Sequence, residues 1–168
     1  KMNIIWHGHS CFEITGKDGT IVFDPYQANS VPGLNSLKLK ANLVLCSHEH
    51  DDHNARNCVE VAPKDFKVTC IETYHDHHQG SHRGKNTIHI VDFENLKVVH
   101  MGDIGCMMDD VSKLKNCDVL MIPIGGYYTI DTKEALKYIE RIQPRIVIPM
   151  HYHSHEFGYD VLSTNEEF

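Results

Sequence analysis

A seven-residue segment constrains this chain more than any other feature: Ser-His-Glu-His-Asp-Asp-His at positions 47–53. Its three imidazoles and three carboxylates directly follow the apolar run at 43–45. Imidazoles this close together repel one another when protonated, whereas a divalent cation binds neutral imidazole nitrogens and ionised carboxylates at the same time. The segment therefore predicts a metal site on a loop that leaves a buried strand. The competing interpretation is a solvated, histidine-rich turn, which ligands elsewhere in the chain would exclude.

The spacing within this segment indicates two half-built sites. His48 and His50 stand two residues apart, so they lie on the same side of an extended chain and can share one ion. The acidic pair Asp51 and Asp52, followed by residues 54–56, is typical of a turn into a helix. That turn would direct Asp52 and His53 toward a second ion.

Length and composition are those of one soluble globular domain covering residues 1–168. No apolar run approaches the ~20 residues that span a bilayer, and the N-terminus lacks the pattern of a secretory signal, so we expect a cytoplasmic protein without a membrane partner. The formal net charge of −7 argues against a nucleic-acid partner, which needs a basic surface. Six cysteines without a C-x-x-C pair are typical of buried thiols. Fourteen histidines, against 16 lysines and arginines, favour metal chemistry.

Apolar runs separated by turn residues predict a chain of short strands. The expected strands cover residues 3–7, 11–15, 21–23, 43–46, 66–74, 87–92, 97–101, 118–123 and 145–149. Weaker patterns predict short helices over 55–61 and 109–116. The clearest helix begins after Asp131, where Glu134 completes a capping box, and ends before Pro144. Its expected apolar stripe consists of Ala135, Leu136, Ile139 and Ile142.

Four of the expected strands end in residues that can bind metal. These residues are His48 and His50, His75, Asp103 and His151. Loops on a rigid sheet can gather such distant residues into one pocket, and their joint occurrence is stronger evidence than any single histidine. Three further histidines are close enough in sequence to replace His75, namely His77, His78 and His82. We prefer His75 because it directly follows a strand, and we interpret the others as loop or substrate-facing residues.

Taken in order, these residues resemble the metallo-β-lactamase superfamily. The likeness rests on H-x-H-x-D-H at 48–53, then His75, Gly102-Asp103 and His151, and on flanking motifs at 6–12, 23–25, 80–86, 123–126 and 148–152. The flanking motifs resemble the branch of small bacterial hydrolases that includes L-ascorbate-6-phosphate lactonase. The resemblance implies an α/β fold, a four-layer αββα sandwich, with a two-metal site at one edge of its sheets.

The resemblance also implies a role for each ligand. His48, His50 and His75 would bind the first ion, Asp52, His53 and His151 the second, and Asp103 would bridge the two. His9 and Asp24 match positions near the site, and we expect Asp24 to hold a ligand imidazole through its free N–H. The chain departs from the family in having little inserted sequence over the cleft. This leaves substrate enclosure and the contacts of a homo-oligomer open.

Nitrogen and oxygen ligands suit two zinc ions, our first choice, and also manganese, iron or nickel. Such a pair would lower the pKa of a bound water toward ~7 and supply hydroxide for attack on a small ester or lactone. Asp52 and Asp103 would be the catalytic carboxylates, with Asp52 orienting the water. The expected partner is a small-molecule substrate. Arg83 or Lys85, on the loop at 80–86, could bind a phosphate group on that substrate. We prefer Arg83 because its planar guanidinium matches phosphate geometry, with a solvated loop arginine as the alternative.

Two other functions are left open by the residues. The same metal pair could hydrolyse a phosphodiester in a nucleotide or nucleic acid, although the acidic net charge argues against a polymer. The other is a non-hydrolytic metal-binding or di-iron redox module. Redox relatives typically carry a carboxylate where His50 stands, and a silent module would have lost ligands that this chain retains.

Overall fold

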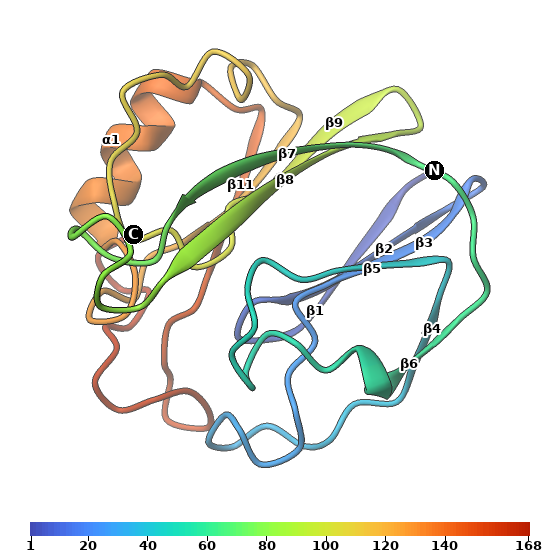
Figure 1. The fold of residues 1–168 in the computed structure, drawn as a ribbon, viewed down its shortest axis with the longest axis horizontal. Coiled ribbons are helices and arrows are strands. Elements are labelled where there is room, and N and C mark those ends of the chain that lie inside the picture. Colours follow the sequence, from blue (N-terminus) through green and yellow to red (C-terminus); the bar gives the residue numbers. More distant parts are fainter.

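In the computed structural model, which describes residues 1–168, two β-sheets pack face to face (Figure 1). The N-terminal sheet has the order β1-β2-β3-β5 and consists of β1 (Asn3–Gly8), β2 (Cys11–Gly16), β3 (Gly19–Phe23) and β5 (Leu43–Leu45). The second sheet has the order β11-β10-β9-β8-β7 and consists of β7 (Lys67–Tyr74), β8 (Lys85–Phe93), β9 (Leu96–His100), β10 (Val119–Pro123) and β11 (Ile146–Met150). The expected strands are therefore present, and the one over 66–74 is continuous.

Apolar side chains that alternate along the strands fill the space between the two sheets. Phe12 of β2 and Phe23 of β3 are cross-strand partners, and they belong to one buried cluster with Phe93 and Met121 of the second sheet. All four side chains are essentially inaccessible to solvent. Close packing of this kind makes the two sheets a rigid frame for the loops that leave them.

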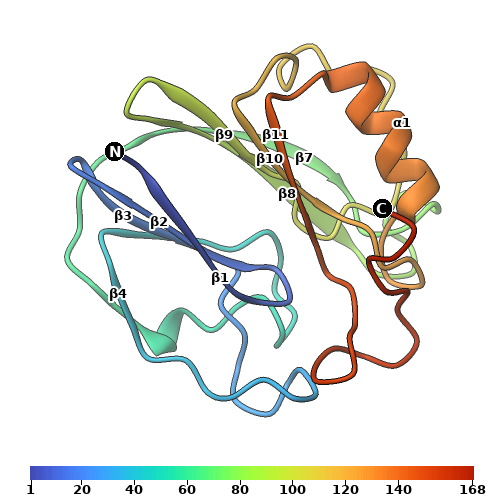
Figure 2. The same cartoon turned by 180° about the vertical axis from the view of Figure 1, so that it is seen from behind.

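Helix α1 (Thr132–Ile142) packs on the outer face of the second sheet, on the side away from the N-terminal sheet (Figure 2). The predicted capping box is present. The backbone N–H of Glu134 donates to the Asp131 carboxylate, and the N–H of Asp131 donates to the Glu134 carboxylate. The helix ends at Ile142. The next residue, Gln143, has a left-handed backbone (φ 55°) that stops the helix directly before Pro144.

The predicted apolar stripe of α1 is wrong at Leu136, which is 45% exposed. Tyr138 is buried instead. Its hydroxyl donates to the carbonyl of Cys106 and accepts the N–H of Met108, so the ring can be buried without leaving its polar atom unsatisfied.

The helix predicted over 55–61 is replaced by a 3-10 turn, η1 (Arg56–Cys58), and a strand, β6 (Val59–Val61). Strand β6 pairs in parallel with β4 (Leu39–Ala41), which the sequence pattern did not predict. Val59 is buried against the outer face of the N-terminal sheet, where its β-branched side chain suits an extended backbone.

The helix predicted over 109–116 is also absent, and the segment is a series of turns. Leu114 reaches the core, while the ammonium group of Lys97 donates to the carbonyls of Lys113 and Lys115. These carbonyls bond to a side chain rather than to a following helical turn.

The predicted metallo-β-lactamase sandwich is thus present, with a difference in one outer layer. The second sheet carries α1, whereas η1, β4 and β6 lie on the side of the N-terminal sheet (Figures 1 and 2). The chain contains no helix that is both long enough and apolar enough to span a membrane.

Candidate metal centre

The predicted ligands gather where strands of both sheets end. Residues 47–53 follow β5, His75 follows β7, Asp103 follows β9 after two residues, and His151 follows β11. The turn between β1 and β2 adds His9, which the sequence placed only near the site. A single edge of the sandwich therefore collects side chains from five separate loops.

One oxygen of Asp103 stands at the middle of this collection. Its Oδ2 lies 2.9 Å from His53 Nε2, 3.0 Å from His75 Nε2, 3.1 Å from His151 Nε2 and 3.5 Å from His48 Nε2. Ligands on a tetrahedral ion with bonds of about 2.1 Å lie roughly 3.4 Å apart. These separations are therefore those of atoms that can share metal ions, with Asp103 common to histidines of both predicted groups.

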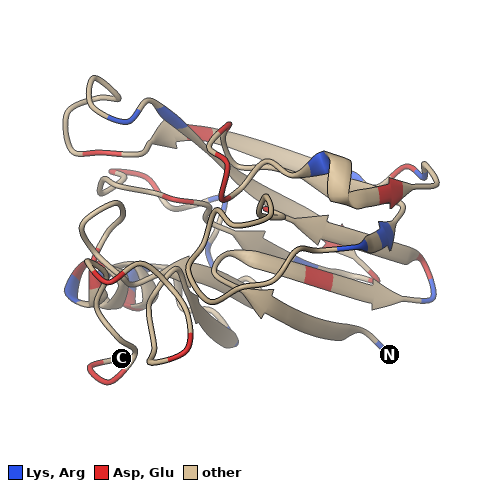
Figure 3. Ribbon diagram, turned by 90° about the horizontal axis from the view of Figure 1, so that it is seen from below, with Lys and Arg blue, Asp and Glu red and all other residues tan.

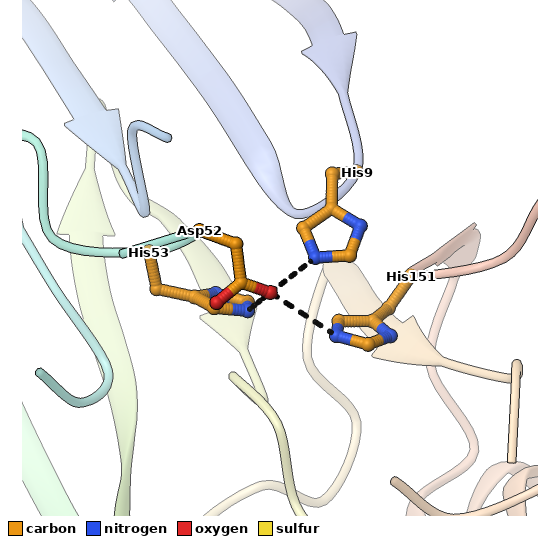
Figure 4. Close-up of side chains that lie close together, drawn as sticks. All are labelled: His9, Asp52, His53 and His151. Carbon is orange, nitrogen blue, oxygen red and sulfur yellow. Dashed lines mark hydrogen bonds and ion pairs between the residues drawn. The ribbon is translucent and has the colours of Figure 1, made fainter. Parts of the chain in front are cut away.

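Apart from Asp103, the ligands form two groups. The ligand atoms of His48, His50 and His75 all lie within 4.8 Å of one another, and so do those of Asp52, His53, His151 and His9. Figure 4 shows the second group, with the three imidazoles directed toward the Asp52 carboxylate. A third group, Asp24, His48 and His53, joins one histidine from each of these two sets. His9 goes beyond its predicted place near the site, because its Nε2 lies 2.8 Å from Asp52 Oδ2.

Asp24 holds two residues of this centre in place by hydrogen bonds. It is completely buried, and its Oδ2 lies 2.8 Å from His53 Nδ1. The same carboxylate accepts the backbone N–H and the hydroxyl of Ser47, and the Ser47 hydroxyl lies 2.8 Å from His48 Nδ1. Ser47 was not predicted, and its only sequence signal was its place directly before the first histidine.

Asp103 is held in place through its backbone. Its N–H donates to Oδ1 of Asn86, whose amide group donates in turn to the Met101 carbonyl. Gly102, with φ of 60°, leaves no room for a side chain, since a Cβ atom there would lie 2.4 Å from Asn86 Oδ1 and 2.5 Å from Ser47 Cβ. Asn86 is a second positioning residue that the sequence did not identify.

Three residues of the centre have left-handed backbones although none is glycine: His9 (φ 54°), Asp24 (φ 46°) and His151 (φ 56°). Such conformations cost about 1 kcal/mol or more and occur preferentially at functional sites. Each directs its side chain into the shared cluster at the point where a strand ends.

Several buried polar atoms of the centre make no hydrogen bond of regular geometry within the chain, although the three nitrogens among them lie 2.9–3.5 Å from Asp103 Oδ2: His48 Nε2, His53 Nε2, His151 Nε2 and Asp103 Oδ1. Buried polar atoms normally have partners, so a group of them facing one point calls for another explanation. Three imidazole nitrogens and a carboxylate oxygen are the donor set of a divalent transition metal. The residues therefore fit the predicted metal ions.

Electrostatics keeps His48, His9 and Asp103 in the forms that bind metal, and it favours a cation beside His53. Burial lowers the pKa of His48 to about 3 and that of His9 to about 4, so both rings are neutral at pH 7. Burial raises the pKa of Asp103, but the histidines around it, His151 foremost, bring it well below its usual value. Burial likewise lowers the pKa of His53, and Asp103 and Asp52 outweigh this and raise it. The two carboxylates thus favour a positive charge at this position.

A pocket of about 280 Å³ opens over the centre. Its lining consists of His50, Asp52, His75, Arg83, Asp103, Tyr128, His151 and Tyr159. A larger hollow of about 360 Å³ lies against β7, β8 and β9, lined by three lysines and without a histidine. We take the first pocket as the candidate active site because it contains the metal-ligating groups.

The other histidines lie outside the cluster. His77 Nε2 lies 3.2 Å from a Glu134 carboxylate oxygen, and the exposed rings of His78 and His82 stand 3.9 Å apart. Among the candidates near the end of β7, only His75 contacts Asp103, and its role as a ligand stays a prediction.

The chain is similar to known proteins in both sequence and fold. A family model described as the beta-lactamase superfamily domain matches residues 3–151. A UPF0173 metal-dependent hydrolase of Thermoplasma acidophilum is 28% identical over 205 residues, which cover 99% of this chain and 88% of the relative. One of Staphylothermus marinus is 30% identical over 194 residues, covering 88% and 82%. The crystal structure of a candidate Zn-dependent hydrolase of the metallo-β-lactamase superfamily from Thermotoga maritima has a TM-score of 0.78 and 28% identity, covering 100% of this chain and 84% of that one.

Proposed function

We propose a function for this chain from the family to which it belongs, the metallo-β-lactamase superfamily, where its UPF0173 relatives are metal-dependent hydrolases. The chain is a metal-dependent hydrolase of this superfamily. The proposal is that it hydrolyses a small ester or lactone, with two zinc ions held by the seven predicted ligands.

The observation that carries this proposal is the position of Asp103. A carboxylate oxygen within 3.5 Å of four imidazole nitrogens, drawn from both ligand groups, suits a residue shared between two ions. His48, His50 and His75 would hold one ion, and Asp52, His53 and His151 the other. A bound pair of divalent ions supplies an activated water and polarises the substrate oxygen.

Asp52 would orient the attacking water. Its carboxylate lines the pocket and lies against His9 and His53. Burial raises the pKa of Asp52, but contact with His53 and His9 brings it far below its usual value. Asp52 therefore stays ionised at neutral pH and accepts a hydrogen bond. Such a weak base is better suited to holding a water molecule than to removing its proton.

The dimensions and charge of the site favour a small substrate. A pocket of about 280 Å³ lies near the lower end of the range for small-molecule sites, roughly 300–1,000 Å³. In the view of Figure 3, basic residues are scattered among acidic ones along the ribbon, and the net charge is −7. These observations favour an ester or lactone over a nucleic-acid phosphodiester.

A substrate panel tests the proposal. Lactones, aryl esters and bis-aryl phosphodiesters are assayed with protein loaded with zinc, manganese, iron or nickel. We expect turnover of lactones or aryl esters that requires metal, with zinc among the active ions, and that is lost in His151→Ala. Turnover of phosphodiesters alone would contradict the ester or lactone assignment, and higher activity with another metal at equal occupancy would contradict the choice of zinc.

A further inference from the structure

Arg83 differs from every other arginine of the chain because its guanidinium has no hydrogen-bond or ion-pair partner. Arg56 pairs with Glu49, Arg145 pairs with Asp118, and Arg141 donates to two backbone carbonyls. The Arg83 guanidinium takes part in no hydrogen bond or ion pair, yet it lines the pocket over the metal centre. A half-buried cation with free donors in a candidate active site indicates a ligand of opposite charge.

Two tyrosines support this side chain. The Arg83 Cζ atom lies 5.5 Å from the centre of the Tyr128 ring and 5.9 Å from that of Tyr127. An aromatic ring attracts a guanidinium through its face, and this contact uses none of the N–H donors. The tyrosines therefore restrict Arg83 while its donors stay available to a ligand, and Tyr128 itself forms part of the pocket lining.

Asp76 holds the loop that carries Arg83. Its buried carboxylate accepts four backbone N–H groups, those of His78, Gly80, His82 and Arg83, at 2.7–3.0 Å. The loop is thus organised around this carboxylate, and one of the bonds fixes the backbone of Arg83.

We propose that Arg83 binds a phosphate or carboxylate substituent of the substrate. It lies on the loop held by Asp76, and its guanidinium packs against Tyr127 and Tyr128 of another loop. The planar guanidinium donates two parallel hydrogen bonds to such an oxyanion. This inference rests on the proposed function, because it assigns a substrate class to the same pocket. Arg83 is a substrate-binding residue, and Asp76 is a positioning residue that acts through it.

Kinetics with matched substrates test the proposal. Two lactones or aryl esters that differ only in one phosphate or carboxylate group are compared in the zinc-loaded wild type, Arg83→Ala, Arg83→Lys and Asp76→Asn. For Arg83→Ala we expect KM for the anionic substrate to rise about 10- to 100-fold, with little change in kcat or in either constant for the neutral substrate. Arg83→Lys should recover part of the loss, and Asp76→Asn should raise the same KM. Arg145→Ala is the control because its guanidinium pairs with Asp118 outside the pocket.

A direct binding measurement separates this inference from the proposed function. Methyl phosphate and acetate are titrated into the zinc-loaded wild type and into Arg83→Ala by calorimetry, which needs no turnover. For the oxyanion that the pocket selects, we expect the affinity of the variant to be at least tenfold weaker than that of the wild type. Any contact with metal is common to both proteins, so the difference reports Arg83. If no ester or lactone is hydrolysed but this difference persists, the proposed function fails and the anion site stands. Equal binding by the two proteins, or equal KM for the anionic substrate, would overturn the inference.

Discussion

Oδ2 of Asp24 lies 2.8 Å from Nδ1 of His53, and both side chains are fully buried. The contact links the end of β3 to the loop after β5. An ionised carboxylate can only accept, so His53 donates its Nδ1–H to Asp24, which leaves Nε2, 2.9 Å from Asp103, as the nitrogen that would bind a metal ion. The pKa of Asp24 is about 2. Burial alone would raise this pKa, but His100 and His53 lower it by more than burial raises it, so the carboxylate remains ionised.

Replacing Asp24 with Asn should therefore weaken metal binding. The Asn amide can donate to Nδ1 of His53, which would move the proton of that ring to Nε2 and block it as a ligand. We expect zinc affinity to fall about 10- to 100-fold, measured by competition with a chromophoric chelator. Asp18→Asn, at an exposed turn, is the control. Unchanged affinity in Asp24→Asn would refute the positioning role of Asp24.

Replacing Asp103 or His151 with alanine should leave different numbers of metal ions bound to the chain. Asp103 contacts histidines of both groups, whereas His151 belongs to the group with Asp52 and His53. We expect Asp103→Ala to lose both ions and His151→Ala to lose mainly one. Metal-to-protein ratios at limiting zinc compare the two variants. Retention of two ions by Asp103→Ala would contradict its shared position.

His89 provides a test of stability against pH outside the metal centre. Burial lowers its pKa to about 4, from about 6.5 in the unfolded chain. Between these values the unfolded state binds more protons, so the contribution of His89 is complete above pH 6.5 and is lost as the pH falls toward 4. The loss is at most about 3 kcal/mol.

We expect the free energy of unfolding of His89→Gln to fall less than that of the wild type over this range, as measured by urea denaturation. The metal ligands titrate in both proteins, so the difference between the two curves isolates His89. His155→Gln, at an exposed position, should follow the wild type. Parallel curves for His89→Gln and the wild type would show that His89 is not responsible.

Gly105 packs directly behind the His75 ligand. A Cβ atom at this position would lie 2.4 Å from the carbonyl carbon of His75 and 2.5 Å from the backbone nitrogen of Asp76. We expect Gly105→Ala to destabilise the fold by about 1–3 kcal/mol and to weaken metal binding by displacing His75. Thermal unfolding and zinc affinity are compared with those of Ser81→Ala, an exposed position in the loop between β7 and β8 that also carries His75. Wild-type values for both would exclude this displacement.

Features that are local in sequence could be predicted. The capping box needs only Asp131 and Glu134, and the ligand segment at 47–53 is continuous, so neighbouring residues carry enough information for each. The order of the expected strands, four of which end in a candidate ligand, could also be predicted, because runs of apolar residues mark each strand. The assignment of each ligand to an ion remains a prediction.

Features that depend on contacts between distant segments could not be predicted. Strands β4 and β6 have three residues each, too few for a periodic pattern, and each depends on the other for its hydrogen bonds. The roles of Ser47 and Asp76 depend on which donors and acceptors the fold brings to them. His9 reaches Asp52 only through a left-handed turn after β1, and no residue pattern marked that conformation.

The metal content of the protein tests the account most directly. Protein purified without added metal or chelator is loaded with zinc, freed of excess ion by gel filtration and measured by elemental analysis, with the wild type beside Asp103→Ala. We expect two zinc ions per wild-type chain and a clear loss in the variant. A wild-type chain that binds no ion, or a single ion whatever the zinc concentration, would contradict the two-ion site.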